Sequence, residues 1–291
     1  MKYDLHVHST FSDGELTPRE LLNLCHEKNI SILAITDHNN ILGSKQALKE
    51  NIYPDITVIP GIELTAKSPS SINLHILGYN MNLEDSNLNY VCKEIMKDNV
   101  RRIKSLISQL KKSYDITFKD KDIKEVFSSS GNIGRPDIAK LCLKYGYVKS
   151  VEDAFKYLFK PIRDKLVKKE FELTDKECIK CIVDAGGIAS LAHPVTLKKN
   201  SEELETYIYG LANEGLEAVE VYHSDNPPAL TNQLLQVTND LKLFQSLGSD
   251  FHGPIIKPEI QIGSGINNNL INKDATIITK LLEGKNYDKD S

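Results

Sequence analysis

Apolar segments that end in histidine or acidic side chains recur along this chain. The first is Asp4-Leu-His-Val-His8, in which His6 and His8 are separated by one residue. Because side chains alternate between the two faces of a strand, both imidazoles project to the same side. Two neighbouring imidazoles can bind a metal ion, although the same short pattern also occurs in strands that bind nothing.

Polar residues of the same kinds follow further apolar segments. They are His38, Glu63, His75, His193, Asp250 and His252, and Asp13 comes just after the first segment. Polar residues at the ends of several strands are the usual arrangement of an active site in an α/β barrel. A core selected for stability alone has no reason to gather imidazoles and carboxylates at equivalent positions. We therefore expect these residues, with His6 and His8, to meet at one mouth of a barrel.

The pattern of apolar residues predicts seven strands with helices between them. The strands are expected at about residues 3–7, 31–36, 57–63, 73–78, 187–192, 216–221 and 243–249. Several of these segments are continuous apolar runs, which are typical of a parallel sheet covered on its outer face. Alternating strands and helices with polar residues at strand ends predict an α/β fold, a distorted TIM-like barrel.

A long helical stretch interrupts this alternation. Helices are expected at about residues 86–113, 120–127, 135–145 and 150–159. We therefore expect residues 1–82 and 173–291 to form the barrel and residues 83–172 to form an inserted helical domain that captures substrate.

The charges are divided unequally between the two predicted parts. Residues 93–169 hold 20 Lys and Arg against 10 Asp and Glu, and the remainder holds 16 against 30. A basic insertion beside an acidic barrel indicates capture of a polyanion, such as a nucleotide with two phosphates or an RNA end. The alternative is a solvated, lysine-rich helix surface.

Several classes of protein are disfavoured by the sequence. It begins without an apolar leader and has no apolar run of membrane-spanning length, so we expect a cytoplasmic protein without a membrane partner. No Gly-x-x-x-x-Gly-Lys phosphate loop and no Ser-His-Asp or Cys-His pattern is apparent. The five cysteines are scattered, which argues against a disulfide framework.

The ordered motifs resemble those of the PHP (polymerase and histidinol phosphatase) superfamily. From about residue 3 to residue 254 they are Asp4-Leu-His-Val-His8, Thr36-Asp-His-Asn39, Pro60-Gly-Ile-Glu63, Leu74-His75, Ala192-His-Pro194 and Ser249-Asp-Phe-His-Gly253. Gly134-Arg-Pro136 and the segment 145–155 are most similar to stand-alone phosphoesterases that act on nucleoside 3′,5′-bisphosphates and short RNA 5′ ends. The resemblance implies a (β/α)7 barrel of the PHP fold with an inserted helical cap.

The resemblance also implies how metal ligands are shared. One ion would be held by His6, His8, Glu63 and Asp250, a second by Glu63, His75 and His193, and a third by Asp13, His38 and His252. We expect three divalent ions, with two as the alternative, and the ligands suit manganese, iron or zinc. A hydroxide bridging the ions would attack phosphorus. Asp4 and Asp37 are expected to orient imidazoles.

Three further residues are candidates for substrate binding and catalysis. Arg135 is expected to bind a phosphate through its guanidinium, and a surface arginine is the alternative. Asp137 departs from the resemblance, because relatives usually carry a histidine there that helps to bind substrate, and an acid would repel phosphate. His223 ends the sixth predicted strand and is either a general acid or a residue outside the chemistry.

We therefore expect a metal-dependent phosphoesterase acting on a nucleoside 3′,5′-bisphosphate (pAp-type), with short RNA 5′ ends as a further substrate and without recognition of DNA sequence. One alternative is a phosphatase of the histidinol-phosphate type, which would not need a long basic insertion. The other is an inactive metal-binding module, which would be expected to have lost some of its ligands.

Overall fold

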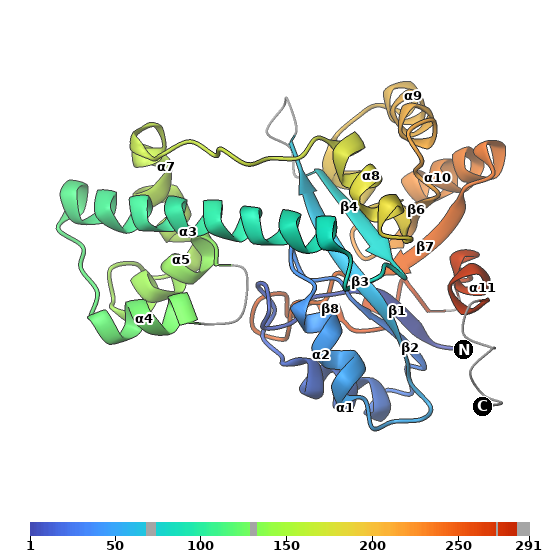
Figure 1. Cartoon of the computed structure of the whole chain (residues 1–291), viewed down its shortest axis with the longest axis horizontal. Helices are drawn as coiled ribbons and strands as arrows, with labels where there is room; N and C mark the ends of the chain where they lie inside the picture. Colours follow the sequence, from blue (N-terminus) through green and yellow to red (C-terminus); the bar gives the residue numbers. More distant parts are fainter. Residues whose placement is uncertain (68–73, 129–132, 272, 284–291) are drawn as a thin grey trace.

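The seven strands of the central sheet lie side by side in the order in which they occur along the chain. The computed structural model describes residues 1–67, 74–128, 133–271 and 273–283. In the order of both sheet and chain, the strands are β1 (Tyr3–Val7), β2 (Ile32–Ile35), β3 (Thr57–Ala66), β4 (Leu74–Tyr79), β5 (Ile188–Leu191), β6 (Ala218–His223) and β7 (Phe244–Gly248). All seven strands were predicted. The TIM-like barrel is confirmed (Figure 1).

The ends of the sheet meet and nearly close the barrel. The N–H of Asp250 donates to the carbonyl of His6, and the N–H of His8 donates to that of Phe251, each over 2.9 Å. These bonds join the residues that follow β7 to strand β1. They place two of the predicted polar segments side by side at the barrel mouth.

Strand β4 runs against the direction of its neighbours. It is antiparallel to both β3 and β5, whereas the other neighbouring pairs are parallel. His75 therefore lies near the beginning of its strand, and the reversal brings this beginning to the mouth where the other strands end. The sequence pattern had placed His75 at a strand end without revealing the reversal.

Amphipathic helices cover the outside of the barrel. They are α1 (Pro18–Glu27), α2 (Leu42–Glu50), α8 (Asp175–Asp184), α9 (Ser201–Ala212), α10 (Pro228–Leu241) and α11 (Ile277–Leu282). Helix α1 begins with a capping box between Thr17 and Glu20 and buries Leu21, Leu22 and Cys25. A short hairpin that was not predicted, β8 (Ile260–Gln261) and β9 (Gly265–Ile266), follows β7. No helix within the described ranges is long and apolar enough to cross a membrane.

The segment between β4 and β5 forms a group of helices beside the mouth (Figure 1). They are α3 (Ser86–Tyr114), α4 (Asp120–Ser128), α5 (Arg135–Lys144), α6 (Val151–Asp153), a π-helix (Ala154–Phe159), α7 (Lys160–Ile162) and a 3₁₀ turn (Arg163–Lys165). Their apolar side chains, including Leu106, Ile138 and Phe159, form a cluster of their own. This cluster supports the division at residues 83–172, which we retain as a proposal, and we call the segment the cap.

Within the cap, helix α3 connects the barrel to the remaining cap helices. Because β4 is reversed, the chain leaves it at the end opposite the mouth and must return. Helix α3 has 29 residues, contains neither proline nor glycine, and is therefore about 43 Å long at about 1.5 Å per residue. Its first half packs on the barrel core through Leu88, Val91 and Ile95, and its second half carries cap residues.

Candidate metal centre and substrate cavity

The side chain of Glu63 lies at the middle of the polar cluster. It projects from β3 and is fully buried. Its Oε1 lies 2.8 Å from Nδ1 of His75, 2.9 Å from Nε2 of His193 and 3.4 Å from Nε2 of His6. Its Oε2 lies 2.9 Å from Nδ1 of His38. One carboxylate therefore faces several possible ligand groups, as the predicted bridging role requires.

The first expected ligand group is assembled at the closure of the barrel. Nε2 of His8 lies 3.3 Å from Oε2 of Glu63 and 3.2 Å from Oδ1 of Asp250, and Nε2 of His6 lies 3.5 Å from the same Asp250 oxygen. Two ligands about 2.1 Å from a tetrahedral ion are about 3.4 Å apart. The four side chains thus have the spacing that a single ion needs.

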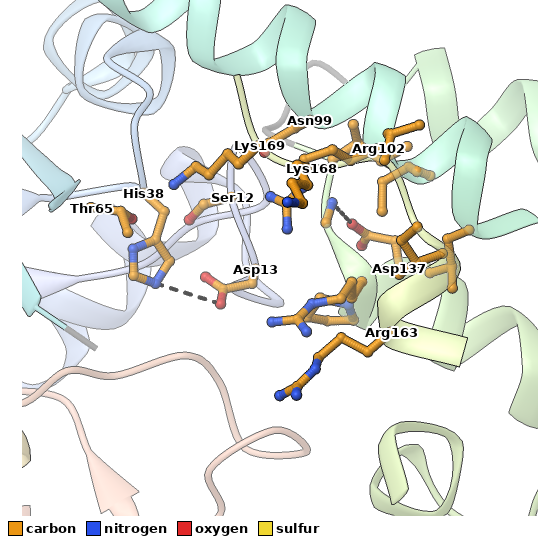
Figure 2. A pocket seen from close by; sticks show the side chains of 18 of the residues that line it. Ser12, Asp13, His38, Thr65, Asn99, Arg102, Asp137, Arg163, Lys168 and Lys169 are labelled. Atoms are coloured by element: carbon orange, nitrogen blue, oxygen red, sulfur yellow. Dashed lines mark hydrogen bonds and ion pairs between the residues drawn. The ribbon is translucent and has the colours of Figure 1, made fainter. Parts of the chain in front are cut away.

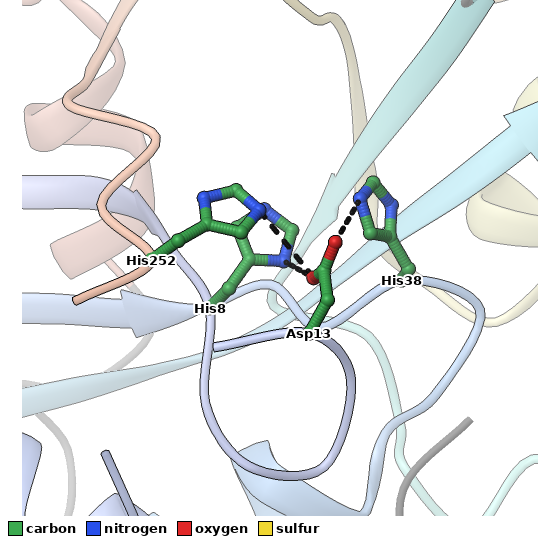
Figure 3. Close-up of side chains that lie close together, drawn as sticks. All are labelled: His8, Asp13, His38 and His252. Atoms are coloured by element: carbon green, nitrogen blue, oxygen red, sulfur yellow. Dashed lines mark ion pairs between the residues drawn. The ribbon is translucent and has the colours of Figure 1, made fainter. Parts of the chain in front are cut away.

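The other two expected groups flank the first. In the second, Glu63 lies beside His75 and His193, whose Nδ1 and Nε2 are 3.1 Å apart. In the third, Oδ1 of Asp13 lies 3.4 Å from Nε2 of His252, and Oδ2 lies 3.7 Å from Nε2 of His38. Figure 3 shows these three side chains turned toward one another, with His8 beside them. The structure therefore gathers all nine of the predicted ligands.

Buried polar atoms in this cluster fit a bound metal. Nε2 of His6, Nε2 of His8, Oδ1 of Asp13 and Oε2 of Glu63 are buried and make no hydrogen bond within the described part of the chain. Buried polar atoms are normally satisfied, so such a concentration indicates partners of another kind. Nitrogen and carboxylate oxygen are the donors that zinc, iron and manganese accept.

Hydrogen bonds fix which imidazole nitrogen faces the centre. Nδ1 of His6 lies 2.8 Å from Oε1 of Glu220, and Nδ1 of His193 lies 3.1 Å from Oγ1 of Thr196. Nδ1 of His252 lies 2.8 Å from the carbonyl of Asp250. Because each acceptor takes the proton on Nδ1, Nε2 is the nitrogen that can bind an ion once any proton on it is displaced.

Glu220 is the most important site residue that the sequence reasoning missed. It lies on β6, is fully buried, and accepts the backbone N–H of His193 over 2.6 Å in addition to the bond from His6. The signal in the sequence was a charged residue within the apolar run Ala218 to Val221. A buried carboxylate needs partners, and both of these partners belong to possible ligands or their backbone.

The expected role of Asp4 and Asp37 is wrong in detail. Asp4 accepts backbone N–H groups of Ser249 and Gly263 over 2.9 and 2.7 Å, so it orders loops rather than an imidazole. Asp37 accepts the hydroxyl of Ser12 over 2.6 Å, and Ser12 in turn lies 3.3 Å from Nδ1 of His8. Its influence on an imidazole therefore passes through a serine.

The protein surroundings shift the pKa values of the clustered groups in opposite directions. Burial alone would lower the pKa of His8, but the carboxylates of Asp250 and Glu63 raise it to about 10. Burial alone would raise the pKa of Glu63, but the surrounding histidines, with His75 foremost, hold it well below its usual range. Without ions, protons therefore hold the cluster together, and an ion must displace them.

A cavity of about 510 Å³ lies between the mouth and the cap (Figure 2). Asp13, His38 and His75 line one part of it. The cap contributes five basic side chains, Arg102, Arg135, Arg163, Lys168 and Lys169. In Figure 2, Lys169 extends toward Ser12 and His38. An anion in the cavity would therefore face positive charge from the cap and possible metal ligands from the barrel.

Arg135 occupies the first position of α5. Its partial burial and the nearby Arg102 lower the pKa of its guanidinium, and the ring of Phe155 lies 5.6 Å away. The described residues give neither arginine an ion pair with a carboxylate. Two close guanidinium groups in a cavity repel each other, and an anion between them would relieve that repulsion.

Asp137 takes part in capping the N-terminus of helix α5. Its Oδ2 accepts the backbone N–H of Gly134 over 2.8 Å, as a residue at the third helical position does in a capping box. Burial and the nearby Asp13 raise the pKa of its carboxyl group. The acid that departs from the family pattern thus has a structural partner, although it still lines the cavity.

His223 ends β6 and is buried beside the cluster. Its Nδ1 accepts the backbone N–H of Asp225 over 3.1 Å, and its Nε2 lies 3.8 Å from Oδ2 of Asp250. The ring centroid of His193 is 5.6 Å from its own. The side chain therefore borders the cluster, and its hydrogen bonding differs from that of His6, His193 and His252.

A family model described as the PHP domain matches residues 4–236. The chain is 28% identical over 265 residues to the 5′-3′ exoribonuclease Rnm of Escherichia coli, covering 90% of this chain and 88% of that protein. It is 25% identical over 256 residues to the 3′,5′-nucleoside bisphosphate phosphatase of Chromobacterium violaceum, covering 86% and 87%. A phosphoribosyl 1,2-cyclic phosphate 1,2-diphosphodiesterase of Eggerthella lenta is also 25% identical, with 86% and 94% covered.

Solved structures share the fold. A protein of Bifidobacterium adolescentis, assigned as a metal-dependent phosphoesterase, superposes with a TM-score of 0.79 at 25% identity, and 96% of this chain and 95% of that one are covered. An amidohydrolase of Chromobacterium violaceum gives a TM-score of 0.78 at 23% identity, with 97% and 96% covered. The second likeness concerns the fold alone.

Proposed function

This chain belongs to the PHP domain family of metal-dependent phosphoesterases, and on that premise we propose that its substrates are nucleoside 3′,5′-bisphosphates. We propose short RNA 5′ ends as a further substrate. Both carry a phosphate that can reach the metal centre and a second phosphate on the same nucleotide or its neighbour. We also propose a location in the cytoplasm. Family membership itself establishes neither the substrates nor this location.

The two-sided cavity is the observation that carries this proposal. Possible metal ligands line it at the barrel, and five basic side chains line it at the cap. Arg163 and Lys169 have carboxylate partners in Asp164 and Glu172, whereas Arg102 and Arg135 have none within the described residues. A small phosphomonoester has one dianionic group and would leave these two arginines without an anion. A nucleotide with two phosphates offers one anion to each side, and charge-assisted bonds to the second phosphate would add affinity. The relatives that act on bisphosphates and on RNA support the same choice.

Ions of manganese, iron or zinc, two or three in number, would be held by the nine gathered residues and would supply Lewis-acid stabilisation and an activated water. The chain's own residues bind and orient the nucleotide. Arg102 and Arg135 bind the distal phosphate, which is the one that is not hydrolysed. Lys169 provides positive charge near the mouth, where the charge on the reacting phosphate must be balanced.

The test is hydrolysis by protein reconstituted with manganese, with zinc and with iron in turn. We expect kcat/KM for adenosine 3′,5′-bisphosphate to exceed that for adenosine 5′-monophosphate and for histidinol phosphate by at least about tenfold, the worth of one charge-assisted contact. A short 5′-phosphorylated RNA tests the second substrate. Equal kcat/KM for bisphosphate and monophosphate would contradict the proposal, and metal binding without hydrolysis of any ester would favour an inactive module.

A further inference from the structure

The side chain of Thr65 lines the substrate cavity beside the metal centre. Thr65 follows Glu63 by two residues on β3, so the two side chains share one face of the strand and are about 6.6 Å apart along it. In the sheet register Thr65 lies opposite His75, and cross-strand partners share a face. Figure 2 shows its side chain next to His38. The Thr65 hydroxyl therefore reaches the cavity among expected metal ligands.

Two hydrogen bonds to the side chain of Asn39 fix the role of this hydroxyl. The backbone N–H of Thr65 donates to Oδ1 of Asn39 over 2.9 Å, which sets the orientation of the amide. Nδ2 of Asn39 then lies 3.0 Å from Oγ1 of Thr65. Because an amide nitrogen can only donate, Oγ1 accepts this bond. Asn39 is itself held, since its backbone N–H donates to the carbonyl of Glu63 over 2.8 Å.

The proton of the Thr65 hydroxyl remains available. A hydroxyl has one proton to donate, and the only side-chain bond of Oγ1 among the described residues is the one that it accepts from Asn39. The side chain is half-buried and lines the cavity. A ligand oxygen that lies beside His38 and His75 would therefore meet a donor whose direction the protein has already set.

We propose that Thr65 is a substrate-binding residue whose hydroxyl donates a hydrogen bond to a non-bridging oxygen of the phosphate at the barrel mouth. Asn39 is a positioning residue that directs this donor. The inference rests on the proposed phosphoesterase function, and it assigns the reacting phosphate to the barrel and the distal phosphate to the cap arginines. A hydrogen bond to a charged oxygen is stronger than one between neutral groups, so the contact contributes to affinity.

Two substitutions at Thr65 test the donor. Thr65→Val keeps the branched shape and removes the hydroxyl, whereas Thr65→Ser keeps the hydroxyl. In the manganese-loaded protein we expect inorganic phosphate to bind to Thr65→Val about 10- to 100-fold more weakly by calorimetry, the cost of one hydrogen bond to a charged group. Thr65→Ser should recover most of this loss. Thr206→Val, an exposed change on α9, is the matched control.

A substitution at Asn39 separates the donor from a purely structural role. The φ angle of Asn39 is 52°, which glycine adopts without strain, so Asn39→Gly removes the amide and leaves the backbone conformation accessible. It removes two hydrogen bonds and should lower Tm more than Thr65→Val does. It leaves the Thr65 hydroxyl in the cavity, so phosphate binding should weaken less than in Thr65→Val. The reverse order of phosphate affinities would show that the pair only holds the loop of His38, and would overturn the proposal.

Metal content and a bound structure test the inference without turnover. Manganese content should be the same in Thr65→Val as in the unmodified protein. A crystal structure of the loaded protein with inorganic phosphate should place a phosphate oxygen within about 3 Å of Oγ1 of Thr65. Loss of manganese, unchanged phosphate affinity or a phosphate bound away from Thr65 would each overturn the proposal. Absence of hydrolysis of every ester by the unmodified protein would instead contradict the proposed function.

Discussion

Glu220 accepts the Nδ1 proton of His6 across 2.8 Å, and this bond links the sixth strand of the barrel to the first. The same carboxylate holds the backbone N–H of His193. One buried acid thus orients the imidazole of His6 and fixes the backbone that carries His193. Its position in an apolar strand is explained by this task rather than by stability.

Glu220→Gln is expected to weaken metal binding by about 10- to 100-fold, because acceptors behind ligand imidazoles have effects of that size. The amide can accept only through its oxygen, so it cannot satisfy both N–H donors that the carboxylate holds. Competition with a fluorescent chelator measures the affinity. Glu205→Gln, an exposed change on α9, is the control. Unaltered affinity in Glu220→Gln would remove this residue from the metal centre.

Arg135→Ala and Arg102→Ala are each expected to raise KM for adenosine 3′,5′-bisphosphate by about 10- to 100-fold, since each removes a charge-assisted contact to phosphate. KM for 4-nitrophenyl phosphate, which has no second phosphate, should change by less than about twofold. Steady-state kinetics with both substrates test this. Lys180→Ala, on the outer helix α8, removes a charge far from the cavity and serves as control. Equal effects on both substrates would exclude selective binding of the distal phosphate.

Asp137→Asn and Asp137→Ala are expected to have different effects. The asparagine oxygen can still accept the N–H of Gly134, so the helix start is retained while a negative charge leaves the cavity. KM for the bisphosphate should therefore fall by a few-fold. The alanine variant removes the charge and the cap together and should lose about 1 kcal/mol of unfolding free energy. Chemical denaturation measures the second effect, and a KM that rises in Asp137→Asn would show that the acid assists binding.

Acidity should oppose metal binding. The pKa of His8 is raised from 6.5 to about 10, so its protonated form stabilises the metal-free protein fully below pH 6.5, and this contribution is lost as pH rises toward 10. The pKa of Glu63 is lowered, so its ionised form contributes above the ordinary carboxyl pKa and is lost on acidification. Metal-free protein should therefore be most stable in mildly acidic solution.

Manganese must displace the proton of His8, so its apparent affinity should increase by up to about tenfold per pH unit for each proton displaced between pH 6.5 and 9. Thermal unfolding with manganese and with a chelator measures the effect. The rise in Tm caused by manganese should be larger at pH 8.5 than at pH 6.5. A rise that is independent of pH would show that His8 is already neutral in the metal-free protein.

The sequence allowed the strands and the nine gathered residues to be predicted because each lies next to a recognisable apolar segment. The periodicity of β4 could not reveal its direction, because alternation looks the same for either orientation of a strand. Glu220 was missed because its function depends on His6, more than two hundred residues away. Nothing in the sequence distinguished Arg102 from the other basic residues on α3, and only the folded structure shows that it lies near Arg135.

The surroundings of Asp137 and His223 depend on hydrogen bonds that the spacing of residues in the sequence does not reveal. Asp137 binds the N–H of Gly134, and its capping pattern resembles that of many helix starts. Nδ1 of His223 accepts the N–H of a single backbone group, that of Asp225. Such details belong to tertiary structure, and they decide what the chemistry of a residue can be.

The unbroken course of α3 has a consequence for how ligands enter. Sharp kinks in helices occur mainly at proline, at glycine or serine pairs or at a π-bulge, and α3 is one continuous α-helix without proline or glycine. Arg101 also pairs with Asp98 on α3 and with Glu170 in the irregular segment that returns toward the barrel, over 2.7 and 3.0 Å. We therefore expect the two parts to diffuse as one rigid body, so that nucleotides enter and leave through a permanent opening whose width is set by the rotamers of its arginines and lysines.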